Sequence, residues 1–445
     1  MKGDRDMYLY GTQKVNERGH LEIGGVDTTE LARIYGTPLI VYDIAHFKNR
    51  ANGFKQTFEE LGVTAQVAYA SKAYSSVAIY QLANALGLSL DVVSGGELYT
   101  ALQAGFPAER IHFHGNNKGR QEIEEAFDAG IGCIVLDNFY EIELVDTIAR
   151  EKRKTMPVLL RVTPGVEPST HSYITTGQED SKFGFDLKNG QADEAYRLVR
   201  EKDTFELLGL HAHIGSQIFD AEAFRHAAEA LMDKMVQWRT EDGVICSVLN
   251  LGGGFGIRYT EEDTPLEPEQ YVKGMTEAVV DLSKRHDYPM PEIWIEPGRS
   301  LIGEAGTTIY EVGSAKEVPG TRTYVAVDGG MHDNIRPALY DADYSAAVAN
   351  KMTTPHETIV TIAGKCCESG DQLMQDAALA PMEPGDLLAM FCTGAYTYSM
   401  ASNYNRFSKP AVVFVEDGQH TLVGKRETYE DLLRLDVDLP KEWLS

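Results

Sequence analysis

Hydrophobic and polar positions follow two different rhythms along the chain. Between about residues 66 and 300, short apolar β-rich runs alternate with longer segments whose apolar residues recur every three or four positions, as on one face of a helix. The runs are QVAYA, LSLDVVS, RIHFH, CIVLD, VLLRV, LLGLHAHI, SVLNLGG and EIWIE. Eight strands that alternate with helices predict a (β/α)8 TIM-like barrel of the α/β class, and an open doubly wound sheet is the alternative.

After Gly306 the pattern changes to β-rich runs separated by turn residues, such as TTIYEVGSAKEV, ETIVTIAGK and AVVFVEDG. This pattern predicts a second, mainly β domain. The first forty residues do not share the barrel rhythm. We therefore expect an N-terminal segment (residues 1–39) that packs with the β domain, a barrel over residues 40–305 and a C-terminal β domain over residues 306–445.

Composition and charge narrow the range of functions. At 445 residues the chain is long enough for two domains, and its formal net charge of −26 argues against nucleic acid or an anionic membrane surface as a partner. The five cysteines form no C-x-x-C pair. Neither an N-terminal apolar segment nor a run of about eighteen apolar residues occurs. These features predict reduced thiols, no metal site and a cytoplasmic protein.

Each predicted strand ends in a polar residue or in glycine. In a (β/α)8 barrel these ends meet at one mouth, where the chemistry of such barrels takes place. A single histidine or carboxylate at a strand end is usually a core residue or a helix cap, but a complete set is harder to explain in that way. The strand-end residues are Lys72, Asp91, His114, Asp137, Arg161, His213, Gly252, Gly253, Gly254 and Glu296.

The glycine-rich stretch LGGGFGIR (residues 251–258) follows the seventh predicted strand. That is the wrong place for a dinucleotide fingerprint but a common place for phosphate in barrels. A ligand with a phosphate at one end, a basic nitrogen for Glu296 and an aldehyde for a lysine amine is pyridoxal 5'-phosphate. Lys72 would hold this cofactor as a Schiff base, Glu296 would keep the ring nitrogen protonated, and His213 would lie against the ring.

Ten short motifs occur in one order from about residue 38 to 410: YASKA, DVVSGGEL, FHGNNK, SKFGF, GLHAHIGSQI, LNLGGGFGI, EPGRS, VDGGMHDNIRPALY, CESGD and GAY. Through them the chain resembles the fold-type III pyridoxal-phosphate-dependent decarboxylases, which have an alanine-racemase-like, two-domain architecture. The resemblance implies decarboxylation of meso-2,6-diaminopimelate to L-lysine and CO2, the last step of lysine biosynthesis. It also implies a homodimer with shared active sites.

The resemblance assigns roles by position in these motifs. It implies that Lys72, Cys367 (as proton donor) and His213 are catalytic. The implied cofactor-binding residues are Lys72, Asp91, His213, Ser216, Gly254, Glu296, Pro297, Gly298, Arg299 and Tyr396. The implied substrate-binding residues are Arg299, Arg336, Tyr340, Glu368 and Tyr396.

Charge distinguishes the candidate substrates. The diaminopimelate tail carries a carboxylate and an amine, and it needs arginines together with one acid, as Arg299, Arg336 and Glu368 supply. An ornithine- or arginine-type tail is cationic and needs acids. The alternatives are a decarboxylase of ornithine, arginine or lysine, a racemase on the same barrel, and an inactive regulatory relative. Lys72 and Cys367 count against the inactive relative.

Two positions depart from the family pattern. The family usually has proline before the cysteine motif, whereas GKCCESGD places Lys365 there and adds a second thiol at Cys366. The segment GGMHDN carries His332 where a smaller polar residue is common. We expect these departures to affect loop conformation rather than the chemistry.

Overall fold

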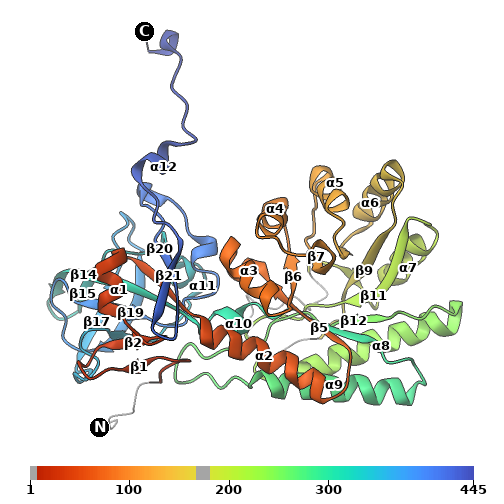
Figure 1. Ribbon diagram of the computed structural model, residues 1–445, viewed down its shortest axis with the longest axis horizontal. Coiled ribbons are helices and arrows are strands. Elements are labelled where there is room, and N and C mark those ends of the chain that lie inside the picture. Colours follow the sequence, from red (N-terminus) through yellow and green to blue (C-terminus); the bar gives the residue numbers. More distant parts are fainter. Residues whose placement is uncertain (1–7, 167–180, 445) are drawn as a thin grey trace. The chain divides into compact units, whose positions relative to one another are not determined.

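A computed structural model describes residues 8–166 and 181–444. The chain divides into two compact units, at His46/Phe47 and at Gly303/Glu304 (Figure 1). We call residues 47–303 the barrel unit, and the two flanking segments together the β unit. The predicted boundary at residue 39 lies just before β4 (Leu39–Asp43). This strand pairs with strands of the β unit, so the division comes after it.

All eight apolar runs form parallel strands of one sheet, in the order β10-β9-β11-β12-β13-β5-β6-β7-β8 with β10 added beside β9. A further pairing of β8 with β9, which aligns Ile134 with Val158, closes the sheet. The (β/α)8 prediction is therefore confirmed, and the open doubly wound alternative is wrong. The strands are β5 Ala65–Ala70, β6 Ser89–Val92, β7 Ile111–Phe113, β8 Cys133–Leu136, β9 Met156–Thr163, β10 Phe185–Asp186, β11 Phe205–His211, β12 Val248–Asn250 and β13 Glu292–Ile295.

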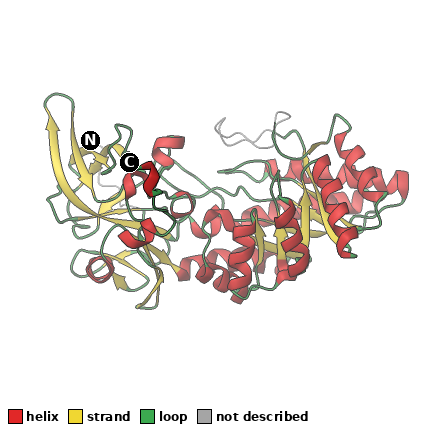
Figure 2. Cartoon of the chain, turned by 90° about the horizontal axis from the view of Figure 1, so that it is seen from above, coloured by secondary structure: helices red, strands yellow, loops and turns green. Residues whose placement is uncertain are grey.

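Helices follow the barrel strands along the chain, and Figure 2 shows them around the strands. Several begin at a side-chain cap that accepts a backbone N–H of the first turn: Ser76 for α3, Ser94 for α4 and Asn138 for α6. The helices are α2 Ile44–Glu60, α3 Val77–Ala85, α4 Gly95–Gln103, α5 Arg120–Ala129, α6 Phe139–Lys152, α7 Gln191–Arg200, α8 Glu222–Asp242, α9 Pro268–Arg285 and α10 Arg299–Ile302.

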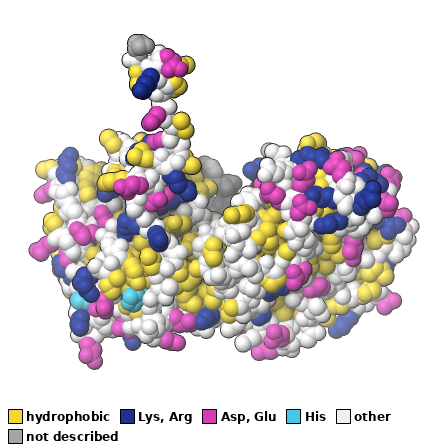
Figure 3. Space-filling view, turned by 45° about the horizontal axis from the view of Figure 1, so that its top comes forward, with side chains coloured by type: hydrophobic (Ala, Val, Ile, Leu, Met, Phe, Trp, Pro, Cys, Tyr) yellow, Lys and Arg dark blue, Asp and Glu magenta, His cyan; other side chains and the backbone are white. Residues whose placement is uncertain are grey.

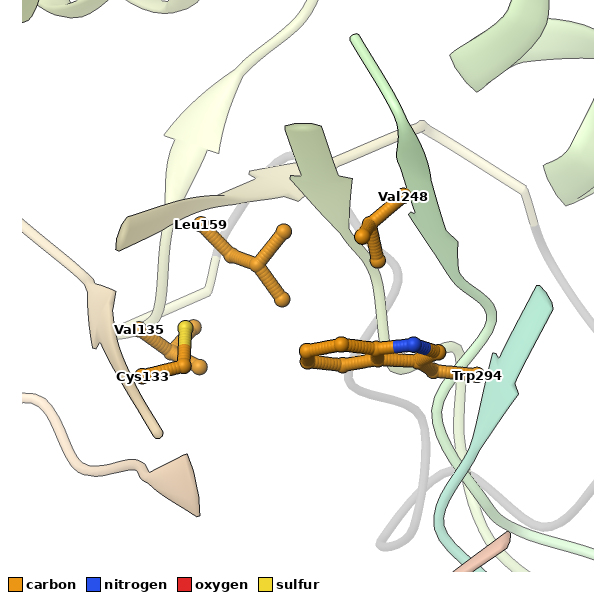
Figure 4. Close-up of a cluster of buried hydrophobic side chains, with 5 residues drawn as sticks. All are labelled: Cys133, Val135, Leu159, Val248 and Trp294. Carbon is orange, nitrogen blue, oxygen red and sulfur yellow. The ribbon is translucent and has the colours of Figure 1, made fainter. Parts of the chain in front are cut away.

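A buried apolar cluster joins four barrel strands (Figure 4). It consists of Cys133 and Val135 on β8, Leu159 on β9, Val248 on β12 and Trp294 on β13. Same-face positions recur every second residue along a strand. The next same-face positions after this cluster are the polar residues Asp137, Arg161, Asn250 and Glu296. The barrel therefore changes from an apolar layer to a polar layer at the carboxyl ends of its strands.

The β unit contains a nine-stranded sheet with the main order β18-β17-β15-β14-β4-β20-β21, and β19 pairs with both β14 and β16. The long strand β14 pairs in turn with β4, β19 and β15. The strands are β14 Gly306–Val318, β15 Arg322–Val327, β16 Ala346–Val348, β17 Thr358–Ala363, β18 Gln372–Leu379, β19 Leu387–Met390, β20 Ala411–Glu416 and β21 Gln419–Gly424. Further elements are β1 Lys14–Val15, β2 Leu21–Ile23, β3 Val26–Asp27, α1 Thr28–Tyr35, α11 Arg336–Tyr340 and α12 Tyr429–Leu433. A mainly β second domain was predicted and is confirmed.

Charged side chains of both signs are interspersed on the face shown in Figure 3. Among the described residues, no helix combines the length and the apolar character that a bilayer crossing requires.

Candidate active site

The barrel unit brings most of the predicted cofactor residues to the carboxyl ends of its strands. Lys72 lies in a 3-10 turn, Ser71–Ala73, directly after β5, and its side chain is exposed although both of its neighbours are buried. The backbone N–H of Ala70 donates to Pro297 O at 3.3 Å, and this bond ties the end of β5 to the segment after β13. The lysine therefore stands at the rim of the barrel beside the end of the last strand.

Glu296 is a deeply buried carboxylate, with 6% of its surface exposed. Asn250 Nδ2 donates to its Oε1 at 2.7 Å, and His211 Nε2 lies within hydrogen-bonding distance of its Oε2, at 3.1 Å. Burial alone would raise the pKa of Glu296, but His114 and His211 lower it to well below its usual value. The side chain is thus an anion at neutral pH.

His213 offers a neutral imidazole close to this anion. Gly253 N–H donates to His213 Nδ1 at 3.3 Å, so the ring proton resides on Nε2. Desolvation, together with the positive charges of Lys72 and Arg161, lowers the pKa of His213 to well below its ordinary value. A neutral aromatic ring can pack flat against another ring without bringing an extra charge.

Asp91 shares the same interior with Glu296. Burial raises the pKa of Asp91 to about 6; His114 and Lys72 oppose the rise, and Glu296 adds to it. Two other strand-end residues pair with each other: Arg161 Nη1 lies 3.7 Å from Asp137 Oδ1. Asp137 also accepts the Gly184 N–H at 3.2 Å. The contact between Arg161 and Asp137 explains why two of the strand ends are polar, and no bound ligand is needed for that explanation.

The glycine loop after β12 is closely packed. Gly254 has φ +102°, and a Cβ there would meet the carbonyl oxygen of Gly215, while a Cβ at Gly253 would meet the carbonyl oxygen of Glu296. Beside this loop, Arg299 Nη2 donates to Ser216 Oγ at 3.0 Å, and Arg299 Nη1 also donates to the hydroxyl of Tyr259. The barrel unit thus sets a guanidinium and a hydroxyl beside a segment where only glycine fits, which is a suitable place for an anion.

These residues fit pyridoxal phosphate. A cofactor with an aldehyde, a basic ring nitrogen and a phosphate needs an amine, an anion and a positive cradle. Lys72 could supply the amine and Glu296 the anion, and Arg299 with Ser216 would form the cradle. The neutral ring of His213 suits the face of the pyridine.

In the β unit, three predicted substrate residues lie together. The guanidinium carbon of Arg336 lies 5.5 Å from the ring centre of Tyr340 and 5.7 Å from that of Tyr396. Arg336 is buried, and its Nε donates to Tyr344 Oη at 2.9 Å. Tyr396 has φ +61°, a left-handed conformation that is uncommon for a residue with a Cβ. Two tyrosine rings therefore fix the direction of one cation.

The loop of residues 364–371 holds Cys367 and Glu368, both exposed. Asp371 organises it: its carboxylate accepts the backbone N–H of Cys366 at 2.8 Å and that of Met331 at 2.7 Å. The Cys367 N–H donates to Asn405 Oδ1 at 2.8 Å. The carboxylate thus ties the loop to the segment around Met331.

The two departures from the family pattern contact each other. His332 Nδ1 lies 3.4 Å from Cys366 Sγ, and the His332 ring lies 4.9 Å from the ring of Phe407. Lys365 extends over the same phenyl ring, at 4.8 Å from its centre. The unusual histidine and the additional thiol therefore belong to one packed cluster, which adjoins Cys367 in the sequence.

Sequence reasoning assigned no role to two residues that bind the Glu296 carboxylate, His211 and Asn250. Signals were present for both. His211 precedes His213 by two residues in HAHIG, and Asn250 is a polar residue within the apolar run SVLNL. A buried polar side chain in such a run needs a hydrogen-bond partner.

The comparisons with known proteins agree with this geometry. The pyridoxal-binding domain model of the pyridoxal-dependent decarboxylases matches residues 44–303. Fold and site thus define a pyridoxal-dependent decarboxylase of the barrel type.

The chain is 62% identical to the diaminopimelate decarboxylase of Bacillus subtilis strain 168 over 431 residues, which cover 97% of this chain and 98% of that protein. It is 46% identical to the enzyme of the same name from Staphylococcus aureus strain COL, with 96% of this chain and 100% of that protein covered. A crystal structure of diaminopimelate decarboxylase from "m. jannaschii" in complex with L-lysine aligns with a TM-score of 0.91 at 36% identity, over 98% of this chain and 100% of that one. The chain therefore belongs to the diaminopimelate decarboxylase family, and the resemblance inferred from the motifs is confirmed.

Proposed function

We propose that this protein removes one carboxylate from meso-2,6-diaminopimelate, releasing CO2 and L-lysine, with pyridoxal phosphate as its cofactor. The observation that carries the proposal is the combination of an exposed lysine at the barrel rim, a buried ionised glutamate and an arginine close to two tyrosine rings. Close relatives that carry the name diaminopimelate decarboxylase support it.

The barrel unit holds the cofactor. Lys72 would attach it covalently, Glu296 would bind its ring nitrogen and His213 would pack on its ring. Asp91 and Pro297 would also contact the cofactor, and its phosphate would be held by Ser216, Gly254, Gly298, Arg299 and, from the β unit, Tyr396. When bound, the cofactor supplies an electron sink for the pair of electrons that the departing carboxylate leaves behind.

The substrate tail is recognised by charge. Arg336 and Arg299 bind the distal carboxylate, and the exposed Glu368 binds the distal amine. Tyr340 and Tyr396 restrict the Arg336 side chain to one direction, which reduces the conformational entropy that it loses on binding. A substrate with a purely cationic tail leaves the arginines unpaired and binds poorly.

Cys367 completes the reaction. Its thiol donates a proton to the substrate carbon that has lost its carboxylate, so that one C–C bond is replaced by one C–H bond. The thiol is exposed in the single chain, and water must be excluded from it during the reaction. We therefore propose a homodimer with shared active sites, in which the loop of residues 364–371 of one chain serves the barrel of the other.

The described cysteines are all free, which fits a reducing compartment, and we propose that the protein works in the cytoplasm.

The test is to incubate the purified protein and its cofactor separately with meso-diaminopimelate, lysine, ornithine and arginine. We expect equimolar CO2 and lysine from the first substrate alone. Turnover of ornithine, arginine or lysine would favour the alternative decarboxylases, exchange of the α-hydrogen without CO2 would favour a racemase, and no turnover of any substrate would favour an inactive relative.

A further inference from the structure

The carboxylate of Glu296 is surrounded by polar side chains from three other barrel strands. Asn250, from β12, donates to Oε1 at 2.7 Å, and His211, from β11, lies 3.1 Å from Oε2. His114, directly after β7, places its Nε2 3.1 Å from Oε1. All three residues are buried, with exposed fractions of 0%, 1% and 4% in the order given. None of them carries a role in the reaction proposed above.

The contacts leave one position of the carboxylate open. A carboxylate has about four lone-pair positions. Asn250 occupies one position of Oε1, and His211 occupies one position of Oε2. His114 Nε2 lies 3.1 Å from Oε1 but is not aligned for a hydrogen bond, so it contributes by proximity. Within residues 8–166 and 181–444 no second donor to Oε2 is found, so its other lone pair is available for an N–H group of a ligand.

Both histidines turn their Nε2 atom toward the Glu296 carboxylate. His211 Nδ1 has no partner among the described residues. A hydrogen on His211 Nε2 points at Glu296 and can be donated to it, because this nitrogen lies within hydrogen-bonding distance of Oε2. His114 Nε2 lies between two carboxylates, 3.1 Å from Glu296 Oε1 and 3.8 Å from Asp91 Oδ1. An imidazole between two carboxylates separates the two acids and reduces their mutual repulsion.

We propose that His211, His114 and Asn250 are positioning residues that orient the Glu296 carboxylate and keep it ionised, so that its free Oε2 lone pair holds the proton of the cofactor ring on the ring nitrogen. This inference rests on the proposed function, because it requires pyridoxal phosphate in the barrel. The electrostatics agree: burial would raise the pKa of Glu296, and the two histidines lower it. If the histidines are lost, the pKa of Glu296 should rise and the proton of the cofactor ring nitrogen would move toward the carboxylate. An unprotonated ring would accept electrons less readily.

The test uses matched substitutions at both histidines. His211→Gln and His114→Gln keep an N–H donor near the original Nε2, whereas His211→Leu and His114→Leu remove it. The matched control is His112→Leu, another buried histidine of β7, whose ring stacks on Trp294 at 4.2 Å. Its loss disturbs core packing without removing a direct contact to Glu296. His211→Asn and His114→Asn, whose amides end one methylene short, serve as second variants if the leucine proteins do not fold.

The direct readout is the nitrogen NMR shift of ¹⁵N-labelled cofactor in the resting holoenzyme, with Glu296→Gln as the unprotonated reference. In the leucine or asparagine variants we expect the signal to move toward that reference, and kcat to fall about tenfold to a hundredfold, the range for losing a hydrogen bond to a charged group. The glutamine variants should recover most of the protonated nitrogen signal and most of kcat. His112→Leu should keep the protonated signal.

Two results would overturn the inference while leaving the proposed function intact: a protonated ring nitrogen and normal kcat in the donor-less variants, or one equivalent of tightly bound metal in the purified protein. The second result matters because the donor atoms of His114, His211 and Glu296 lie within 4.8 Å of one another, a spacing that a cation could also bridge. Wild-type protein that fails to attach the cofactor at Lys72 would contradict the proposed function itself.

Discussion

At the scale of single residues, the surroundings of each titratable group decide its charge. Glu296, Asp91 and His213 share one barrel interior, yet their pKa values move differently. His114 and His211 lower the pKa of Glu296, so its carboxylate is ionised. Burial raises the pKa of Asp91 to about 6. Desolvation and nearby positive charge lower the pKa of His213, so its ring is neutral. A cofactor that needs an anion at one ring atom and a neutral ring above it finds both here.

The first prediction concerns the attachment of the cofactor. Reduction of the holoenzyme with borohydride should fix pyridoxal phosphate to the peptide that contains Lys72, since this lysine is exposed at the end of β5. Mass spectrometry of the digest identifies the modified peptide. Lys118 is an internal control, because its Nζ is buried and lies 3.0 Å from Glu141. Label on any lysine other than Lys72 would refute the assignment.

The second prediction concerns substrate recognition. Arg336→Met should lower kcat/KM for diaminopimelate about tenfold to a hundredfold, because a hydrogen bond between charged groups contributes about 1.5–3 kcal/mol. Cofactor binding, followed by absorbance, should persist. Arg322→Met is the matched control: this arginine belongs to the same β unit and also lies over a tyrosine, 6.0 Å from the ring of Tyr324. Equal kcat/KM in the two variants would show that Arg336 does not bind the substrate.

At the scale of elements, the loop of residues 364–371 depends on one carboxylate. Asp371 accepts two backbone N–H groups, from Cys366 and Met331, and thereby holds two segments of the β unit together. A Cβ at Gly364 would meet the same carboxylate, so a larger residue there would have to displace it. The His332–Cys366 contact packs behind this turn. These contacts determine where Cys367 is presented.

The third prediction follows from this loop. Asp371→Ala should destabilise the β unit and lower kcat, because the buried Cys366 N–H and the partly buried Met331 N–H lose their acceptor. A buried N–H without a partner costs about 1–3 kcal/mol. Thermal unfolding and steady-state kinetics measure the two effects. Glu357→Ala, an exposed acid of the same unit, is the control and should change neither. An Asp371→Ala protein with normal stability and normal kcat would show that the loop needs no such anchor.

At the scale of the whole molecule, the proposed residues are divided between two units. Lys72, His213 and Glu296 belong to the barrel unit, and Cys367 and Glu368 belong to the β unit. A site built from two units can be completed within one chain or between two chains. Shared sites in a two-fold dimer are reciprocal, so each dimer has two of them.

The fourth prediction tests this arrangement. Lys72→Ala and Cys367→Ala proteins are each expected to be inactive. After subunit exchange, random pairing makes about half of the dimers hybrid, each with both lesions in one site and an intact second site, so about a quarter of wild-type activity should return. Mixing either variant with itself is the control. If exchange is demonstrated by mass spectrometry and no activity returns, both residues act within one chain.

Much of this protein is determined by local sequence. The alternation of apolar runs with helical periods is a local property, and it predicts the barrel strands and their order along the chain. Polar residues at the strand ends pointed to Lys72 and Glu296, because parallel strands bring their carboxyl ends to one edge. The motifs, read by position, then predicted the family, which the comparisons confirm.

Other features arise only when distant segments meet. The β8–β9 pairing closes the barrel, and the pairing of β4 with β14 and β20 draws an N-terminal strand into the β unit. Hydrogen bonds between strands join residues that no sequence window contains together. For the same reason the sequence alone gives no role to His211 and Asn250. Both contact the Glu296 carboxylate, which lies 85 and 46 residues further along the chain. The sequence by itself determined which chemical groups are present, and the tertiary structure decided their charge and direction, because both depend on burial and on partners brought together by folding.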